Sequence, residues 1–178
     1  MAARTALKRL HLAEVIFIPA ASPPHKKRER IVAAHHRYRM VKLGIVNRRD
    51  FMISDLEMRR KGPSFTIDTV RMMRKRFPKR SLYFIVGSDT VSSIPTWRRY
   101  RELLREVAFA VVFRPGHPLK KLPGFNSSFV LIPAPGINIS ARQLRKNLTE
   151  RRPTRNWMPA AVAKYIQSKR LYLGKETL

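Results

Sequence analysis

The sequence predicts an α/β fold with a mainly parallel sheet and helices on both faces. Along the 178 residues, short β-branched or aromatic runs alternate with segments of helical periodicity. Strands and helices that alternate in this way are joined by crossover connections into a parallel sheet. Two predicted strands, at 82–86 and 107–113, are unbroken apolar runs. Such runs are typical of strands that are covered on both faces of the sheet.

The first half of the chain contains two predicted strands and an intervening helix. Val15–Ile18 is β-branched and aromatic, and Pro19 ends it, so we predict a buried strand. Residues 22–27 form a loop, because two prolines prevent a helix there. Apolar residues at helical spacing predict a helix over 31–46. The aliphatic and aromatic run at 51–53 predicts a second, short strand.

Hydroxyl residues mark the starts of two further helices. After the break at Gly62-Pro63, Ser64 or Thr66 is predicted to cap a helix, because either hydroxyl can accept a hydrogen bond from the first turn. Ser140 is likewise predicted to cap a helix that ends at Leu148. The remaining predicted elements are strands at 82–86, 107–113 and 129–132 and helices at 100–106 and 159–169.

Composition indicates one domain over residues 1–178, with 137–178 as a C-terminal helical portion. Apolar residues make up 44% of the chain, which is enough for a core, and cysteine is absent, which excludes a disulfide framework. The longest apolar run, 107–113, is too short to span a bilayer. The basic N-terminus lacks the apolar core of a signal peptide, so we expect a cytoplasmic protein with no membrane association.

The charge is strongly positive. Lys and Arg total 38 against 11 acidic residues, a net charge of +27, and they are spread along the whole chain. Such a charge attracts polyanions, including nucleotides and nucleic acids. Two interpretations stay open at this point. The basic residues are either a solvated surface, as in a protein from a basic proteome, or a face that binds nucleic acid non-specifically.

Two segments with unusual chemistry follow predicted strands, where parallel sheets bind their ligands. In the Pro-Pro-His-Lys-Lys run at 23–27, His25 and Lys26 can hold a phosphate, although the alternative is a solvated basic loop. In Gly87-Ser88-Asp89, glycine lets a ligand approach the backbone and the acid can bind ribose hydroxyls. The alternative there is an ordinary turn with Asp89 as the N-cap of the next helix.

Two other segments combine a basic side chain with an aromatic ring or a helix start. Trp97 beside Arg98 can stack on a planar heterocycle and pair with a carboxylate or phosphate. The alternative is a core tryptophan with an exposed arginine. Ser140 at a helix start leaves backbone N–H groups for an anion, and Arg142 and Arg145 share one helix face. The alternative is a capped amphipathic helix with a basic outer face.

Taken together and in order, motifs from about residue 7 to 173 resemble those of the nicotinate-nucleotide adenylyltransferases of the nucleotidyltransferase superfamily. The ordered set is far more specific than any one of its members. The motifs are Val15-Ile16-Phe17-Ile18-Pro19, Pro23-Pro24-His25-Lys26, His36-Arg37-Tyr38-Arg39-Met40, Ser54-Asp55-Leu56-Glu57, Gly62-Pro63-Ser64-Phe65-Thr66-Ile67-Asp68-Thr69, Ile85-Val86-Gly87-Ser88-Asp89-Thr90, Pro95-Thr96-Trp97, Arg114-Pro115-Gly116, Ile139-Ser140 with Arg145, Tyr165-Ile166 and Leu171-Tyr172.

The resemblance implies a Rossmann-like nucleotidyltransferase fold and a step of NAD biosynthesis. ATP and nicotinate mononucleotide would give nicotinate adenine dinucleotide and pyrophosphate, with Mg²⁺ accompanying ATP. The 5′-phosphate of the mononucleotide would attack the α-phosphorus of ATP in line, without a covalent enzyme intermediate. Positioning and cationic donors would supply the catalysis.

The resemblance also implies roles for individual residues. Ser140 and Arg145 would be catalytic at the triphosphate, Trp97 would face the pyridine ring, and backbone N–H groups would take the carboxylate of the ring. No metal site built from protein side chains is expected. The implied ATP-binding residues are Gly87, Asp89, Ile139, Ser140, Arg145 and Lys26. The implied mononucleotide-binding residues are Ser64, Thr66, Trp97, Arg98 and Arg114.

The chain departs from the family pattern in two places. Arg142 stands where the family usually has a hydroxyl residue. The family also opens with a strand and Gly-Gly-Thr-Phe-Asp-Pro-x-His-x-Gly-His, whose histidines bind the ATP phosphates, whereas this sequence begins inside the following helix. We therefore expect the first strand to be missing, through a misassigned start codon or a true truncation. Of these we favour misassignment, with weak activity in the 178-residue form.

Two further hypotheses stay open. The chain is a related nucleotidyltransferase that acts on nicotinamide mononucleotide or phosphopantetheine, although its Ser-Phe-Thr and Thr-Trp segments favour the nicotinate substrate. Alternatively, it is an inactive basic remnant that binds nucleic acid, which predicts strongly salt-dependent affinity. The motifs do not predict an oligomeric state.

Overall fold

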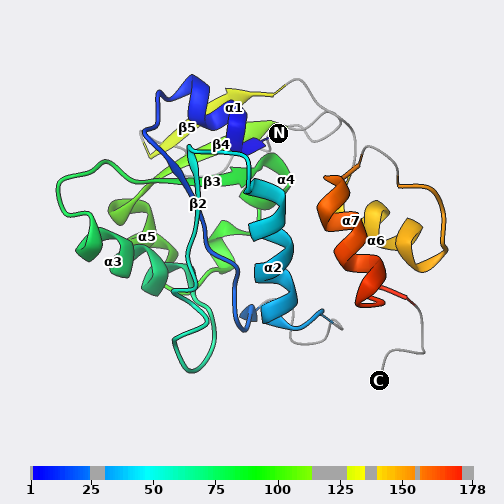
Figure 1. Ribbon diagram of the computed structural model, residues 1–178. Coiled ribbons are helices and arrows are strands. Elements are labelled where there is room, and N and C mark those ends of the chain that lie inside the picture. Colours follow the sequence, from blue (N-terminus) through cyan, green and yellow to red (C-terminus); the bar gives the residue numbers. More distant parts are fainter. Residues whose placement is uncertain (1, 25–30, 114–127, 135–139, 155–156, 174–178) are drawn as a thin grey trace. The chain divides into compact units, whose positions relative to one another are not determined.

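The computed structural model describes residues 2–24, 31–113, 128–134, 140–154 and 157–173 (Figure 1). The chain divides into two compact units, and each unit is built from two separate stretches of sequence. The first unit comprises residues 1–15 and 62–137, and the second comprises residues 16–61 and 138–178. The prediction of one domain with a C-terminal helical portion stays a prediction.

A parallel three-stranded sheet forms the centre of the first unit. Its strands are β3 (Tyr83–Gly87), β4 (Ala108–Phe113) and β5 (Phe129–Pro133), in the order β3-β4-β5. Tyr83 is paired with Ala108 and Phe109 with Phe129, which fixes the register. The predicted parallel sheet is confirmed, and the predicted strand bounds differ from the observed ones by one residue at most.

Alternate residues of β4 point into two different cores. Phe109 and Val111 are fully buried in a cluster with Ile67 of α3 (Thr66–Arg76) and Leu103 of α5 (Tyr100–Glu106). Ala110 and Val112 belong to a second cluster, with Ala6 of α1 (Ala2–Arg9). Because side chains alternate across a strand, the sheet is covered on both faces, as the apolar strands predicted.

The start of α3 differs from the sequence-based prediction. The helix begins at Thr66, and its N-cap is Phe65, which makes no side-chain capping bond. The prediction that Ser64 or Thr66 caps this helix is therefore wrong. Phe65 instead packs its ring against the buried cluster around Ile67. Ile67 and Val70 are buried on the inner face of α3, as the helical spacing predicted.

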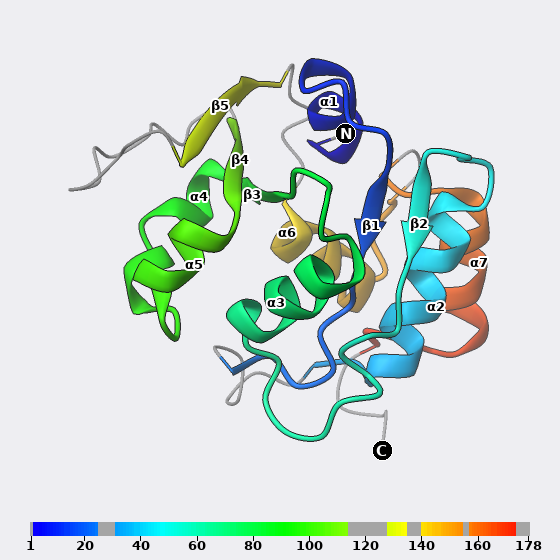
Figure 2. The ribbon, with the colours of Figure 1, turned by 90° about the vertical axis from the view of Figure 1, so that its left-hand side faces the viewer.

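The second unit is organised around helix packing. Its elements are β1 (Val15–Phe17), whose first residue belongs to the first unit, α2 (Ala34–Ile45), β2 (Phe51–Ile53), α6 (Ala141–Thr149) and α7 (Ala160–Ser168). Helix α2 lies alongside α7 (Figure 2), and Val162 and Ile166 of α7 are buried in a cluster with Met40 and Leu43 of α2. His36 Nδ1 and the Tyr165 hydroxyl oxygen lie 2.8 Å apart and are hydrogen bonded.

Strand β2 and helix α5 have the bounds that the sequence predicts, whereas the predicted helix over 31–46 is shorter, at 34–45. Two further short elements join β3 to α5, namely α4 (Ser88–Val91) and the 3₁₀ turn η2 (Ile94–Thr96). Within the described residues, every helix is too short or too polar to cross a membrane.

Candidate active site

The carboxyl end of β3 carries Gly87, Ser88 and Asp89. Gly87 is the last residue of the strand and the N-cap of α4. Asp89 lies in the first turn of α4 and is exposed, whereas Ser88 is buried. The interpretation of Asp89 as the N-cap is therefore wrong. In open parallel α/β sheets, an acidic side chain just beyond the carboxyl end of a strand often binds the ribose hydroxyls of a nucleotide.

Ser140 caps α6 as the sequence predicts. Its Oγ accepts a hydrogen bond from the backbone N–H of Gln143 at 3.0 Å, and its carbonyl accepts one from Leu144 at 3.0 Å. The N–H groups of Ala141 and Arg142 come before Gln143 in the first turn of α6. In an α-helix, N–H groups at these positions have no acceptor within the helix. This helix start therefore presents N–H donors and a positive dipole end to an anion.

Two arginines of the second unit, Arg37 and Arg145, act on the Tyr172 phenol through their charges. Burial raises the pKa of the Tyr172 phenol, and the positive charges of Arg145 and Arg37 act against that increase. Burial lowers the pKa of Arg37, which donates hydrogen bonds to the carbonyls of Val32 and Ala21. Thr149 of α6 donates to the Tyr172 carbonyl at 2.8 Å. Arg145 is exposed and lies one turn beyond the start of α6.

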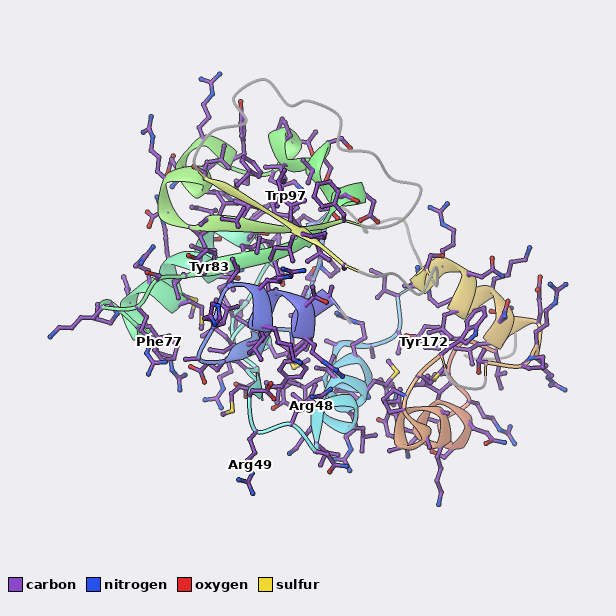
Figure 3. All side chains as sticks on the ribbon, turned by 90° about the horizontal axis from the view of Figure 1, so that it is seen from above. Arg48, Arg49, Phe77, Tyr83, Trp97 and Tyr172 are labelled. Atoms are coloured by element: carbon purple, nitrogen blue, oxygen red, sulfur yellow. The ribbon has the colours of Figure 1, made fainter. Side chains whose placement is uncertain are left out.

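Trp97 takes part in the core of the first unit while part of it stays accessible. Its ring lies 5.8 Å from that of Phe84 in an edge-to-face arrangement and 6.3 Å from that of Phe109. Trp97, which is labelled in Figure 3, is only partly buried. Arg98 beside it is exposed. The core-tryptophan interpretation therefore holds for the part of the indole that packs against the core. The part that reaches solvent is available to stack on a ligand, as the other interpretation requires.

Arg98 lies over the ring of Phe65, with its guanidinium carbon 4.5 Å from the ring centroid. Phe65 directly precedes α3, and its neighbours are the buried Ser64 and the partly buried Thr66. The contact therefore brings the predicted mononucleotide residues on both sides of the site together: Ser64 and Thr66 on one side, Trp97 and Arg98 on the other. Sequence reasoning did not include Phe65 among the site residues.

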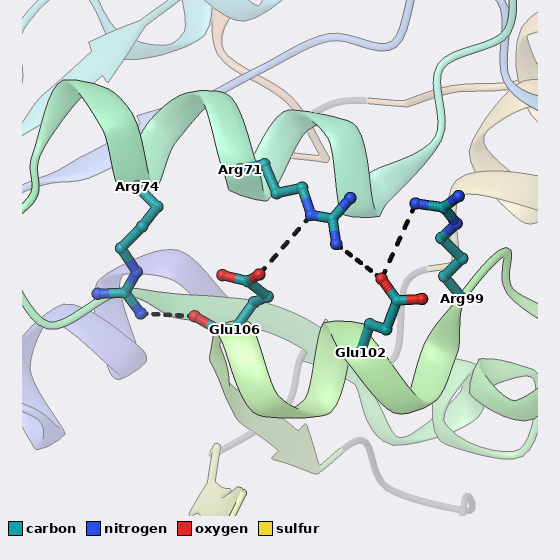
Figure 4. Close-up of polar contacts among 5 residues, drawn as sticks. All are labelled: Arg71, Arg74, Arg99, Glu102 and Glu106. Atoms are coloured by element: carbon teal, nitrogen blue, oxygen red, sulfur yellow. Dashed lines mark hydrogen bonds and ion pairs between the residues drawn. The ribbon is translucent and has the colours of Figure 1, made fainter.

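A row of ion pairs holds α3 against α5 beyond this contact (Figure 4). Arg71 of α3 is 2.6 Å from a carboxylate oxygen of Glu102 and 3.7 Å from one of Glu106. Glu102 also lies 3.9 Å from Arg99, the N-cap of α5, whose φ is 53°. Each pair is partly exposed and contributes little by itself. Together they join α5 and its N-cap to the middle of α3.

The structure places the predicted site residues in two groups. Gly87, Asp89, Ser64, Thr66, Trp97 and Arg98 belong to the first unit, and Ser140 and Arg145 belong to the second. Lys26, Arg114 and Ile139 lie outside the described residues. Among the described residues there is no group of three or more acidic or histidine side chains arranged to hold a metal ion.

The parallel sheet of the first unit, with an acid beyond one strand, is typical of nucleotide-binding α/β proteins. In the second unit, the capped start of α6 is a typical site for an anion. The model of the cytidylyltransferase-like family matches residues 1–147 of this chain. The chain is also similar to the solved structure of the nicotinic acid mononucleotide adenylyltransferase of Plasmodium falciparum complexed with NaAD. The TM-score is 0.76 at 21% identity, over 96% of this chain and 90% of that one. This likeness confirms the nucleotidyltransferase fold.

Curated relatives define the family more closely. The chain is 39% identical to a probable nicotinate-nucleotide adenylyltransferase of Symbiobacterium thermophilum, over 94% of this chain and 86% of that protein. It is 38% identical to one of Thermus thermophilus, over 97% of this chain and 90% of that protein. The chain belongs to the nicotinate-nucleotide adenylyltransferase family, a family of nucleotidyltransferases.

Proposed function

We propose that the chain transfers the adenylyl group of ATP to nicotinate mononucleotide, forming nicotinate adenine dinucleotide and pyrophosphate. The relatives are nicotinate-nucleotide adenylyltransferases, and the solved Plasmodium falciparum enzyme is complexed with the dinucleotide product. The structural observation that carries the proposal is the start of α6. There Ser140 caps the helix through its side chain, which leaves N–H donors of the first turn for phosphate.

The 5′-phosphate of the mononucleotide attacks the α-phosphorus of ATP in line, the new P–O bond forms, and the bond to pyrophosphate breaks. Charge grows on the leaving pyrophosphate in the transition state, so cationic donors placed there lower the barrier. The proposed donors are the backbone N–H groups of Ala141 and Arg142, which follow the Ser140 cap, and the guanidinium of Arg145. Lys26 and Ile139 are proposed to bind the same ATP. Gly87 and Asp89 take the adenosine side, Asp89 through the ribose.

The nicotinate ring is proposed to bind between the start of α3 and Trp97. The first hydrogen bonds in α3 run from the N–H groups of Asp68 and Thr69 to the Phe65 carbonyl. The N–H of Thr66 comes before these bonds, so it has no acceptor within the helix. A helix start of this kind suits the carboxylate that distinguishes nicotinate from nicotinamide. Trp97 would cover the ring, with Ser64, Arg98 and Arg114 around the mononucleotide.

Mg²⁺ is proposed to enter with ATP. The ion keeps most of its waters and binds substrate phosphates with at most one or two protein carboxylates. The described residues fit this arrangement, because their acidic and histidine side chains do not form a cage of three or more ligands. When bound, the ion would neutralise phosphate charge, while the chain's own N–H groups and arginines orient the two nucleotides.

A substrate panel tests the proposal. Pyrophosphate release from ATP is measured with nicotinate mononucleotide, with nicotinamide mononucleotide and with phosphopantetheine. The assay uses the 178-residue chain and, in parallel, any longer in-frame form that the gene encodes. We expect release that depends on nicotinate mononucleotide. A preference for either of the other acceptors would replace this proposal with the corresponding related transferase.

A further inference from the structure

An open pocket of about 500 Å³ lies at the amino ends of the strands of the first unit. Its lining includes Tyr83 and Ala108, the first residues of β3 and β4, and Ser128, which precedes β5. Gly87, at the proposed catalytic edge, is four residues along β3 from Tyr83. At about 3.3 Å per residue, the two ends of β3 are roughly 13 Å apart. The pocket is therefore separate from the proposed nucleotide site.

Four cations and one acid line this pocket. The cations are Arg74, Lys79, Arg80 and Arg105, and the acid is Glu106. The Glu106 carboxylate faces Arg71, at 3.7 Å. Arg80 is 3.5 Å from Glu14, so its charge is partly compensated. Within the described part of the chain, neither Lys79 nor Arg105 has an ion pair with a carboxylate, and the lining keeps an excess of positive charge.

Side chains at this end of α3 are held in fixed positions. Arg74 donates one hydrogen bond to the Arg80 carbonyl at 3.1 Å and another to the Glu106 carbonyl (Figure 4). Two guanidinium groups lie near the ring of Phe77, that of Arg76 at 5.7 Å and that of Arg80 at 5.6 Å from the ring centroid. Two of the four cations that line the pocket, Arg74 and Arg80, are therefore held in place, which lowers the entropy cost of binding an anion there.

An exposed aromatic ring accompanies these cations. Tyr83 lines the pocket and is 36% exposed, although it begins a strand of the sheet. Phe77 and Tyr83 both lie toward the end of the unit where α3 stops (Figure 3). Cations beside exposed aromatic rings are the chemistry that binds single-stranded nucleic acid, since the cations follow the phosphates and the rings stack on bases.

We propose that the pocket at the amino end of the sheet binds a single-stranded nucleic acid, through its phosphates at Lys79 and Arg105 and through a base stacked on Tyr83. Arg74, which also lines the pocket, adds a third cation. This binding does not use the proposed nucleotide site, because the pocket lies at the amino ends of the strands and that site lies at their carboxyl ends. The proposal assigns a function to some of the basic residues that make up the net charge of +27.

Fluorescence anisotropy of the 178-residue chain with a short labelled oligouridylate tests the proposal. The pocket variant carries Lys79→Glu and Arg105→Glu. A matched control carries Lys42→Glu and Lys164→Glu, which make the same charge change at exposed positions of α2 and α7. At about 0.1 M salt we expect the pocket variant to bind about tenfold more weakly or worse. Its slope of log affinity against log salt should fall by about 1.4, for two lost phosphate contacts. The control should change little.

Two further arms identify the ligand and guard against misfolding. Tyr83→Leu should weaken binding about fivefold or more with little change of the salt slope, because stacking is lost and the charges remain. Should the charge reversals lower the melting temperature, Lys79→Gln with Arg105→Gln replaces them. Equal losses in the pocket and control variants would overturn the proposal, as would the absence of binding. Competition by tripolyphosphate as strong as by the oligonucleotide would likewise reduce the pocket to a simple anion site and overturn it.

Discussion

The guanidinium of Arg98 lies over the ring of Phe65, 4.5 Å from its centroid. The two residues are far apart in sequence, but each adjoins a predicted ligand of the mononucleotide: Thr66 follows Phe65, and Trp97 precedes Arg98. The contact therefore links the segment at the start of α3 to the segment that carries the indole. Under the proposed function, it defines the width of the nicotinate pocket.

Replacing Phe65 by leucine should impair the binding of nicotinate mononucleotide. A cation–π contact at an exposed site contributes about 0.5–1 kcal/mol, so KM for the mononucleotide should rise about 2- to 5-fold. KM for ATP should stay the same, because ATP is bound by other residues. Phe65→Tyr keeps the aromatic face and should behave like the original chain. Equal KM values for the leucine and tyrosine variants would show that the contact has no positioning role.

Substitutions at Ser140 should separate helix capping from phosphate binding. Ser140→Ala removes the acceptor of the Gln143 N–H and should lower the free energy of unfolding by about 1 kcal/mol. Ser140→Asp keeps a good cap but places a negative charge at the helix start. Denaturant unfolding should therefore be unchanged in the aspartate variant.

The same aspartate variant should bind ATP poorly, because its carboxylate repels the triphosphate. We expect KM for ATP to rise about tenfold or more, which is the effect of losing about 1.4 kcal/mol of binding free energy. Ser140→Gly, which keeps most of the cap, is the matched neutral control. An aspartate variant with normal affinity for ATP would place the phosphates elsewhere in the chain.

Gly44→Ala should stabilise the second unit. Gly44 lies inside α2, where glycine costs about 0.5–1 kcal/mol relative to alanine. A Cβ at this position would lie 3.8 Å from the Val162 side chain, an ordinary contact distance. Urea unfolding should therefore show a gain of about 0.5–1 kcal/mol. A loss of stability would mean that α2 and α7 pack more closely than the structure indicates.

His36 should make stability depend on pH. Its pKa is lowered from the ordinary value of 6.5, chiefly by burial and then by the charges of His35 and Lys169. The folded chain therefore holds the proton less tightly than the unfolded chain. The contribution of neutral His36 is present above pH 6.5 and is lost as the pH falls through the lowered pKa.

Unfolding midpoints measured between neutral and mildly acidic pH test this sign. The original chain should lose stability as the pH falls, and His36→Gln should lose less over the same interval. Tyr165→Phe, which removes the hydrogen-bonded hydroxyl but leaves the histidine, provides a control for loss of the contact alone. Identical pH profiles for the original chain and His36→Gln would contradict the assignment.

Local signals in the sequence were sufficient where a single segment determines the structure. The cap at Ser140 was predictable because its hydroxyl bonds to Gln143, three residues away. The bounds of β2 and α5 followed from short apolar and helical patterns. The alternation of strand and helix gave the parallel sheet, because crossover connections leave few other arrangements.

Features that depend on distant packing were not predictable. Two hydroxyl residues flank the start of α3, but Phe65 is the N-cap because its ring packs on the core. The placement of Arg98 over Phe65 joins segments whose spacing in the sequence has no helical or strand period. The pocket at the amino ends of the strands combines Lys79 and Tyr83, from one stretch of the chain, with Arg105 from another.

The rate of pyrophosphate release from ATP as a function of nicotinate mononucleotide concentration tests the central claim most directly. We expect release that saturates with this mononucleotide, is far weaker with nicotinamide mononucleotide, and shows a raised KM in the Phe65→Leu variant. Release that is indifferent to the acceptor, or its absence from every in-frame form of the chain, would contradict the proposed adenylyl transfer.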